Sequence, residues 1–148
     1  MTPEAKEWFK KGNISYNQGK YKDAIDCYSK VVAIGPDFVE AWTNKGAALA
    51  NIGNHKDAID CYDKALGIKP ELTKIWHNIG LALYNQGQYE EAVNCYDKVL
   101  KMRPDDVSVL HNKGNDLNKL GKIKEAADCI NRVKKLDPLG YMLGLKNK

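Results

Sequence analysis

The sequence predicts an all-α chain built from repeated antiparallel helix pairs, and three observations support this prediction. Residue types recur with a fixed period of 34 over most of the 148 residues, which is typical of repeat arrays. Within each period, apolar residues follow a helical spacing. Glycine and proline stand at fixed places where helices would end. The positions in common register are Trp8, Trp42, Trp76 and Leu110; Gly12, Gly46, Gly80 and Gly114; Ala24, Ala58, Ala92 and Ala126; and Pro36, Pro70, Pro104 and Pro138.

The first helix pair has clear start and stop signals. Thr2 is a favourable N-cap, and Pro3 suits the first turn because its missing N–H would have no intrahelical partner there. Gly19 is placed to end the first helix. A second amphipathic pattern runs from Tyr21 to Ile34, and Pro36 stops it.

The same signals recur in the three later pairs. Asp37, followed three residues later by Glu40, resembles a capping box at the start of the second repeat. Asp105 is the expected cap of the fourth repeat. We therefore predict eight helices of three to four turns. The glycines expected to end the first helices of these pairs are Gly53, Gly87 and Gly121.

Tight packing explains why small residues recur. Two helices in close contact need a small residue on each side, which Gly46 and Ala58 supply in the second repeat. A single pair leaves one apolar flank open, so about three repeats are needed for stability. We expect all repeats to form one domain. The expected boundaries are a lead at 1–4, repeats at 5–38, 39–72, 73–106 and 107–140, and an apolar tail at 141–148.

The distribution of charges and cysteines along the sequence argues against nucleic-acid binding and against disulfide bonds. The net charge is +4, but 23 basic and 19 acidic residues are interspersed, which argues against nucleic-acid binding. No apolar run reaches the roughly 18 residues of a membrane span, and no signal peptide precedes the first helix. We expect a cytoplasmic protein with no membrane partner. The cysteines recur every 34 residues, too far apart to pair with one another, and are interpreted as free thiols of a reducing compartment: Cys27, Cys61, Cys95 and Cys129.

No constellation of residues indicates catalysis, a metal or a cofactor. His77 and His111 occupy equivalent places in adjacent repeats, where a weak metal site is one interpretation and peptide contact is favoured. His55 stands where sister repeats have tyrosine and is expected to pack. The four equivalent cysteines indicate repetition rather than a nucleophile, which would need a base nearby. We therefore predict a non-enzyme without cofactors.

The spacing of Trp42, Gly46, Ala58, Tyr62 and Pro70 resembles the tetratricopeptide repeat. The resemblance covers about residues 5–138, with departures such as Leu110 in place of tryptophan. It implies a right-handed superhelical array, or solenoid, of antiparallel helix pairs. In this family the first helix of each pair lines a concave groove, and the second lies on the convex side.

The groove that the resemblance implies is rich in asparagine and lysine. Asparagine carries both donors and an acceptor, so a row of asparagines suits the backbone of an extended peptide, and lysine attracts carboxylates. A solvated helix face is the alternative for each single residue. The residues predicted to line the groove are Lys6, Phe9, Lys10, Asn13, Asn17, Asn44, Asn51, Lys74, His77, Asn78, Leu81, His111, Asn112 and Asn115.

The family's chaperone-adaptor branch clamps the terminal carboxylate of an acidic chaperone tail with two lysines, two asparagines and an arginine. Matched by place, Asn13, Asn44 and Lys74 agree with that clamp. Phe9 stands in place of a lysine, and Asn78 replaces the arginine, whose bidentate fork an amide cannot reproduce. The resemblance to the clamp is therefore incomplete.

Two functional hypotheses remain open from the sequence. The favoured one is a protein-interaction scaffold that binds an extended peptide or protein segment, with an acidic tail as one candidate. The alternative is a self-assembling module that works through its apolar ends. The apolar stretch from Leu139 to Leu145 has three possible roles: folding back over the fourth repeat, which we favour, beginning a fifth helix pair, or contacting a second copy to form a dimer instead of the expected monomer.

Overall fold

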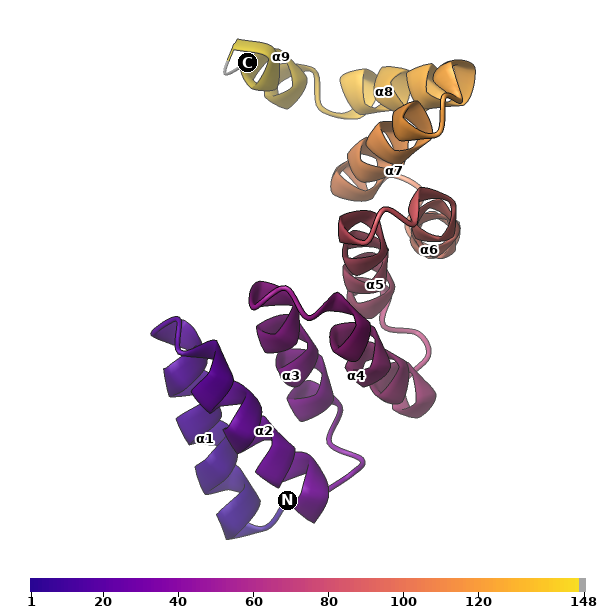
Figure 1. Ribbon diagram of the computed structural model, residues 1–148. Coiled ribbons are helices and arrows are strands. Elements are labelled where there is room, and N and C mark those ends of the chain that lie inside the picture. The colour runs from indigo at the N-terminus through magenta and orange to yellow at the C-terminus, as the bar shows by residue number, and fades with distance from the viewer. Residues whose placement is uncertain (147–148) are drawn as a thin grey trace. The chain divides into compact units, whose positions relative to one another are not determined.

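The structure is a computed structural model that describes residues 1–146, and it is all-helical over that range (Figure 1). It confirms the all-α prediction but contains one helix more than the eight expected, because the apolar C-terminal segment is helical. The helices are α1 (Pro3–Asn17), α2 (Tyr21–Ile34), α3 (Val39–Asn51), α4 (His55–Ile68), α5 (Thr73–Asn85), α6 (Tyr89–Met102), α7 (Val107–Lys119), α8 (Ile123–Leu136) and α9 (Pro138–Lys146).

The chain divides into two compact units, residues 1–82 and 83–148, and the division falls inside α5. In unit 1, α1 packs against α2, α2 against α3, and α3 against α4. In unit 2, α6 packs against α7 and α7 against α8. Among residues 1–146, no helix combines the length and apolar character needed to cross a bilayer.

The helix ends confirm some predicted signals and correct two. Thr2 caps α1 by accepting a hydrogen bond from the backbone N–H of Ala5 at 3.1 Å. Asp37 is not a cap, because α3 begins at Val39 and its N-cap residue is Phe38. The cap of α7 is Asp106, not Asp105, and its side chain accepts from the N–H of Val109 at 3.2 Å. Both predictions were one residue early, and a cap must directly precede the first helical residue.

The first helices of the pairs end as predicted. The glycines after them adopt the left-handed conformation, with φ between 74° and 82°, which a residue with a Cβ rarely adopts. This sharp reversal lets each second helix return antiparallel to the first. The four residues are Gly19, Gly53, Gly87 and Gly121.

The core of unit 1 is aromatic. The Tyr28 side chain is 1% exposed and packs with Ala24 and Ala48, so that α1, α2 and α3 share one cluster. Phe9 joins this core, with its ring centroid 4.9 Å from that of Phe38 and 6.0 Å from that of Tyr28. Aromatic packing across three helices fixes the first two helix pairs to one another.

The core of unit 2 contains a charged group. Leu117 of α7 packs with Val93, Ala126 and Cys129. Asp116, the residue before Leu117, is only 1% exposed, and its Oδ2 atom has no hydrogen-bond partner. Burial raises the pKa of this carboxyl group to about 6. A buried carboxylate is not predicted by the sequence pattern, because aspartate is usually exposed on a helix.

We expected the C-terminal segment to fold back over the fourth repeat, and the structure differs from this expectation. The segment forms α9, which packs on the end of α8 through the Tyr141 ring, 4.9 Å from the Lys134 ammonium. Leu139 and Met142 remain 70% and 58% exposed. An apolar side chain that covered the repeat would be buried, so the fold-back prediction is wrong for residues 138–144. Asn147 and Lys148, which also belong to the predicted tail, lie outside the described residues.

Candidate functional site: the inner-helix face of unit 1

Two predicted groove residues meet across neighbouring helix pairs in unit 1. The side-chain oxygen of Asn13, on α1, accepts hydrogen bonds from the Tyr28 hydroxyl at 2.7 Å and from the Asn44 amide of α3 at 3.3 Å. Asn13 and Asn44 are half-buried, so solvent reaches both. Because one oxygen takes both bonds, the Asn13 amide N–H groups and the Asn44 oxygen stay available to a ligand.

A second polar link joins the same two helices three to seven residues further along. The Asn51 amide of α3 donates to the Tyr16 hydroxyl of α1 at 3.1 Å and to the Ala47 carbonyl at 2.9 Å. The Tyr16 ring packs edge-on against Tyr21, with centroids 5.3 Å apart. We define the asparagine face as Asn13, Tyr16, Tyr28, Asn44 and Asn51.

A buried tyrosine of α2 supports the asparagine face from the core of unit 1. The Tyr28 hydroxyl reaches Asn13 from α2, so the core tyrosine orients a surface amide. Burial raises the pKa of Tyr28 to about 12, and the hydrogen-bonded Asn44 lowers it by a smaller amount. The hydroxyl is therefore protonated, and it remains a donor at neutral pH. From its sequence position, Tyr28 is predicted only to be part of the amphipathic pattern of the second helix. Its place opposite a helix-packing glycine, Gly12, is the signal that could have indicated its role.

Basic side chains border the asparagine face on α1. Lys6, Lys10 and Asn17 are exposed, and with Asn13 they follow a spacing of four, three and four residues. That spacing places them along one stripe of the helix. The stripe carries two positive charges on the N-terminal side of Asn13, Lys10 about one turn and Lys6 about two turns away.

The remaining predicted residues differ in accessibility. Phe9 is half-buried and takes part in core packing, so only part of its ring faces solvent. On α5 of unit 1, Lys74 and Leu81 are exposed, while His77 and Asn78 are half-buried. The predicted residues of α7 belong to unit 2 and are exposed or half-buried: His111, Asn112 and Asn115.

The chemistry of the face is that of hydrogen bonding and charge. In the described part of the chain, no group of three histidine, cysteine or acidic side chains is placed to hold a metal ion. The four cysteines are free, as expected. Burial raises the pKa of the Cys27, Cys61 and Cys129 thiols, which leaves them as weak nucleophiles at neutral pH.

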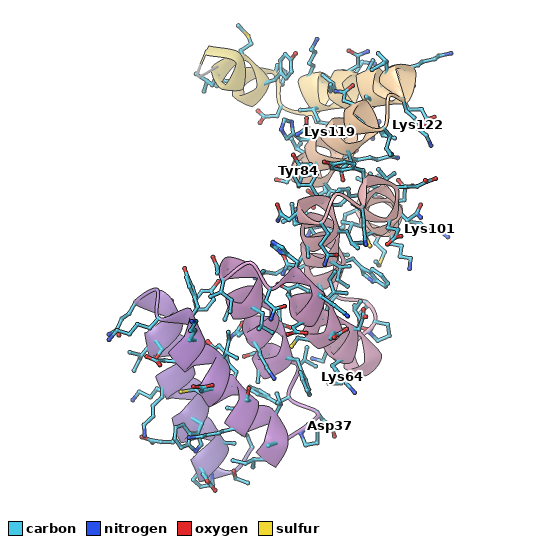
Figure 2. All side chains as sticks on the ribbon, in the orientation of Figure 1. Asp37, Lys64, Tyr84, Lys101, Lys119 and Lys122 are labelled. Atoms are coloured by element: carbon cyan, nitrogen blue, oxygen red, sulfur yellow. The ribbon has the colours of Figure 1, made fainter. Side chains whose placement is uncertain are left out.

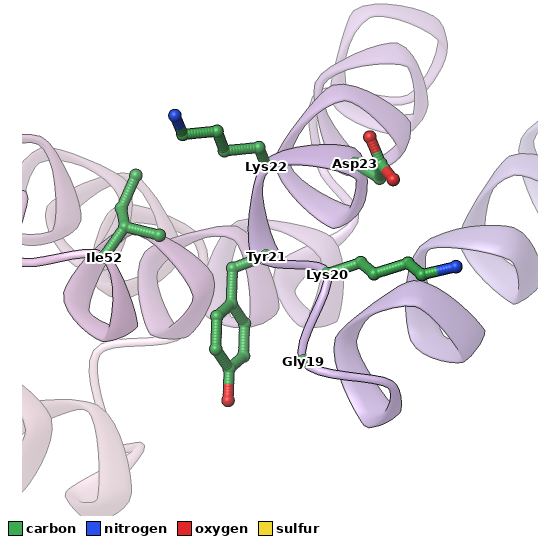
Figure 3. Close-up of a pocket in the computed structure, with 6 residues that line it drawn as sticks. All are labelled: Gly19, Lys20, Tyr21, Lys22, Asp23 and Ile52. Atoms are coloured by element: carbon green, nitrogen blue, oxygen red, sulfur yellow. The ribbon is translucent and has the colours of Figure 1, made fainter.

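A hollow of about 360 Å³ lies at the turn between α1 and α2 and is not a candidate site. Tyr21 and Ile52 supply its apolar walls. The charged groups of Lys20, Lys22 and Asp23 point away from it in different directions (Figure 3). A binding site needs a few convergent polar groups, and this hollow has none.

Comparisons with known proteins agree with this architecture. Residues 39–72 and 73–106 match the model of the tetratricopeptide repeat, and residues 12–53 match a second model, described as TPR repeat. A search of curated protein sequences finds no significant match.

Three solved structures illustrate the similarity. MamA from Desulfovibrio magneticus RS-1 is 21% identical, with a TM-score of 0.88 over 93% of this chain and 78% of that chain. YrrB, described as a TPR protein with an unusual peptide-binding site, is 20% identical, with a TM-score of 0.84 over 97% and 75%. The first TPR of Spaghetti (RPAP3), bound to the HSP90 peptide SRMEEVD, is 26% identical, with a TM-score of 0.76 over 82% and 96%. With the matched residues extending from 12 to 106, the chain belongs to the tetratricopeptide repeat family.

Proposed function

We propose that this chain is a non-enzymatic protein-interaction module that binds an extended peptide on the asparagine face of unit 1. The observation that carries the proposal is the shared hydrogen bonding of Asn13, Tyr28 and Asn44. It holds two amide side chains from different repeats in fixed positions before any ligand arrives. Preorganisation of this kind lowers the entropic cost of binding.

The open polar atoms of the face suit a peptide backbone. The Asn13 amide can donate to a peptide carbonyl or carboxylate, and the Asn44 oxygen can accept from a peptide N–H. The two groups belong to helices α1 and α3, so a strand lying across both helices would meet a donor and then an acceptor. An extended backbone presents the same alternation, whatever its side chains.

Charge favours an acidic ligand. Lys6 and Lys10 are exposed on the stripe that contains Asn13, and Lys74 is exposed on α5 of the same unit. The complex of Spaghetti with SRMEEVD supports this choice, because that peptide carries three acidic side chains and is bound by a protein of the same family. We propose that the terminal carboxylate of such a peptide adds to the affinity.

A binding titration tests the proposal. The probe is the peptide SRMEEVD, with a free or an amidated C-terminus, followed by calorimetry at low and physiological salt. We expect the free acid to bind more tightly and its affinity to fall with salt. Asn44→Ala removes one fixed amide and should weaken binding about tenfold, the effect of roughly 1.4 kcal/mol. Lys74→Ala should reduce the preference for the free acid.

Two control variants remove the same groups elsewhere. Lys56→Ala deletes an exposed lysine from α4, and Asn94→Ala deletes an exposed asparagine from α6. Both are expected to bind as the unaltered chain does. If neither peptide binds, the assignment to acidic tails fails. If Asn44→Ala binds as tightly as the unaltered chain, the asparagine face is not the site.

The exposed apolar residues of α9 favour a second function, assembly of copies through the C-terminal end. Leu139, Met142 and Leu143 are at least 50% exposed on one short helix. We propose that these residues support self-association at high concentration. Sedimentation equilibrium should then show a dimer that Leu139→Glu converts to a monomer. A monomer at all concentrations would exclude this function and leave the peptide-binding proposal intact.

A further inference from the structure

An outer crevice lies on the opposite side of α3 from its asparagine residues, between α2 and α4 of unit 1, with a volume of about 380 Å³. Its floor is apolar and comes from Ile25, Trp42 and Leu49. Lys45 lies in the crevice and is half-buried, with its ammonium 5.6 Å from the centre of the Trp42 ring. An apolar floor with one positive group is a common pattern in sites for small organic ligands.

At the equivalent positions two repeats further along, in unit 2, the lysine is held in an ion pair. A shift of 68 residues, which is two periods of 34, takes Lys45 to Lys113 and Ser29 to Asp97. Lys113 and Asp97 form a salt bridge with an N–O distance of 2.6 Å. In unit 2 the chain therefore supplies its own carboxylate to the equivalent lysine.

Unit 1 has no such carboxylate. Ser29 stands at the place of Asp97, and its hydroxyl donates to the Ile25 carbonyl at 2.7 Å instead of serving Lys45. The crevice of unit 1 thus contains the half-buried Lys45 side chain beside the position that a carboxylate fills in unit 2. Removing a charge from water is costly unless a partner compensates for it.

The charged residues of α4 at the edge of the crevice limit the class of ligand that it can bind. Asp57 and Asp60 of α4 border the crevice, and the exposed side chain of Lys64 projects from the same helix (Figure 2). The Asp57 carboxylate already accepts from the Asn54 amide at 2.7 Å. Two acids at the rim repel ligands with several negative charges, so a single carboxylate on an apolar body fits best.

We infer that the outer crevice of unit 1 binds a small organic monocarboxylate, whose carboxylate pairs with Lys45 and whose apolar body lies on Trp42, Ile25 and Leu49. The carboxylate takes the place that the Asp97 side chain takes in unit 2. The site is separate from the asparagine face, so occupancy of one does not require occupancy of the other.

A pair of reciprocal variants tests this inference on the full chain. The probe is 3-phenylpropionate, and 3-phenylpropionamide is the uncharged control. Binding is measured by the NMR chemical shifts of the backbone amides and of the tryptophan indole N–H groups. We expect saturable shifts at Trp42, Lys45 and Cys61 with the acid, and binding at least about tenfold weaker with the amide. Ser29→Asp places a carboxylate beside Lys45 and should remove the preference for the acid.

The reciprocal change, Asp97→Ser, removes the carboxylate partner of Lys113 in unit 2. In this variant, the acid should change the amide chemical shifts of Lys113 and Cys129, while the changes in unit 1 stay as they are in the unaltered chain. Acid and amide binding equally well to the unaltered chain would overturn the inference. It would also be overturned if Ser29→Asp, shown to be folded by its amide spectrum, bound the acid as tightly as before. Shifts confined to the asparagine face would contradict it as well.

Discussion

Units 1 and 2 place the same repeat positions in different chemical settings. At one register position, unit 1 has Ala48, fully buried, and unit 2 has Asp116, whose carboxyl is almost as buried. At another, unit 1 has Ser29, and unit 2 has Asp97, paired with Lys113. One backbone pattern therefore carries alanine and serine at these places in unit 1, and a buried carboxyl group and a partly exposed ion pair in unit 2.

Repeat position alone therefore does not determine the burial and charge of the group at that position. The same buried helix position holds alanine in unit 1 and aspartate in unit 2. We expect the exchange to change the stability of each unit, because a buried carboxylate without a partner is costly. The following variants exchange these features between the units, in order of decreasing expected effect.

The largest effect is expected from Asp116→Ala, which gives unit 2 the residue that unit 1 has. The folded-state pKa of Asp116 is raised from 3.8 to about 6, so the native state binds the proton more tightly than the unfolded state. The contribution of this group to stability is therefore greatest below about pH 4 and is lost as the pH rises through about 6. Removing it should increase the free energy of unfolding at pH 7.5 by up to about 3 kcal/mol.

At pH 4 the same variant should gain little, because the carboxyl group is then protonated in the folded state and about half protonated in the unfolded state. The measurement is the difference between variant and unaltered chain in denaturant unfolding from pH 4 to 8, supported by amide exchange of residues in α7. The reverse change, Ala48→Asp, should destabilise unit 1 at neutral pH. A gain that does not vary with pH would show that the charge of Asp116 is not the cause.

The next effect contrasts the two packing glycines, Gly46 and Gly114. A Cβ at Gly46 would lie 2.6 Å from the ring of Tyr62, which is 2% exposed and cannot move away. At Gly114 the nearest atoms are 3.4 Å away, because Ile130 replaces the tyrosine. Gly46→Ala should cost about 2 kcal/mol through overpacking. Gly114→Ala should be neutral or stabilising by up to about 1 kcal/mol, since alanine favours the helix.

Thermal and urea unfolding of the two alanine variants measure this contrast. Urea curves allow the free energies of unfolding to be compared at one temperature. The amide NMR spectrum of each variant shows which unit is affected. Equal losses for both variants would mean that the tyrosine does not set the helix spacing in unit 1.

A smaller effect is expected from Tyr28→Phe, which removes the hydroxyl that donates to Asn13. We expect a loss of about 1 kcal/mol in stability, the usual contribution of one hydrogen bond, together with weaker binding of SRMEEVD. Tyr62→Phe is the matched control, because no hydrogen bond contributes to the raised pKa of its hydroxyl. If the two variants behaved alike, the hydroxyl of Tyr28 would not be what orients the asparagine face.

The smallest effect concerns the exposed ion pair. Ser29→Asp should stabilise unit 1, and Asp97→Ser should destabilise unit 2, each by less than about 1 kcal/mol, because the pair is partly exposed and screened. Urea unfolding at low and high salt measures both changes. A salt-independent change would indicate altered packing instead of charge pairing.

The repeat architecture was predictable because its signals are local and occur several times. Helix-ending glycines, the Thr2 cap and the 34-residue register each depend on a few neighbouring residues. The caps at Phe38 and Asp106 were missed by one residue, because the first helical residue depends on how the turn before it packs. A further helix in the C-terminal segment was one of three alternatives but not the favoured one, because its glycine-broken apolar sequence has no amphipathic pattern.

The site was less predictable because it depends on contacts between repeats. Asn13 and Asn44 could be placed on one side of their helices from their spacing, but the shared Tyr28 hydroxyl comes from a third helix. The burial of Asp116 follows from its register with Ala48, a comparison that indicates position but not whether a charge is tolerated there.

The most direct test of the central claim is to map SRMEEVD binding on the full chain by side-chain amide resonances. We predict that the NH₂ signals of Asn13 and Asn44 shift together and saturate at the same peptide concentration. Asn115, an exposed asparagine of unit 2, should not shift. Shifts confined to residues 83–146 would contradict the assignment of peptide binding to unit 1.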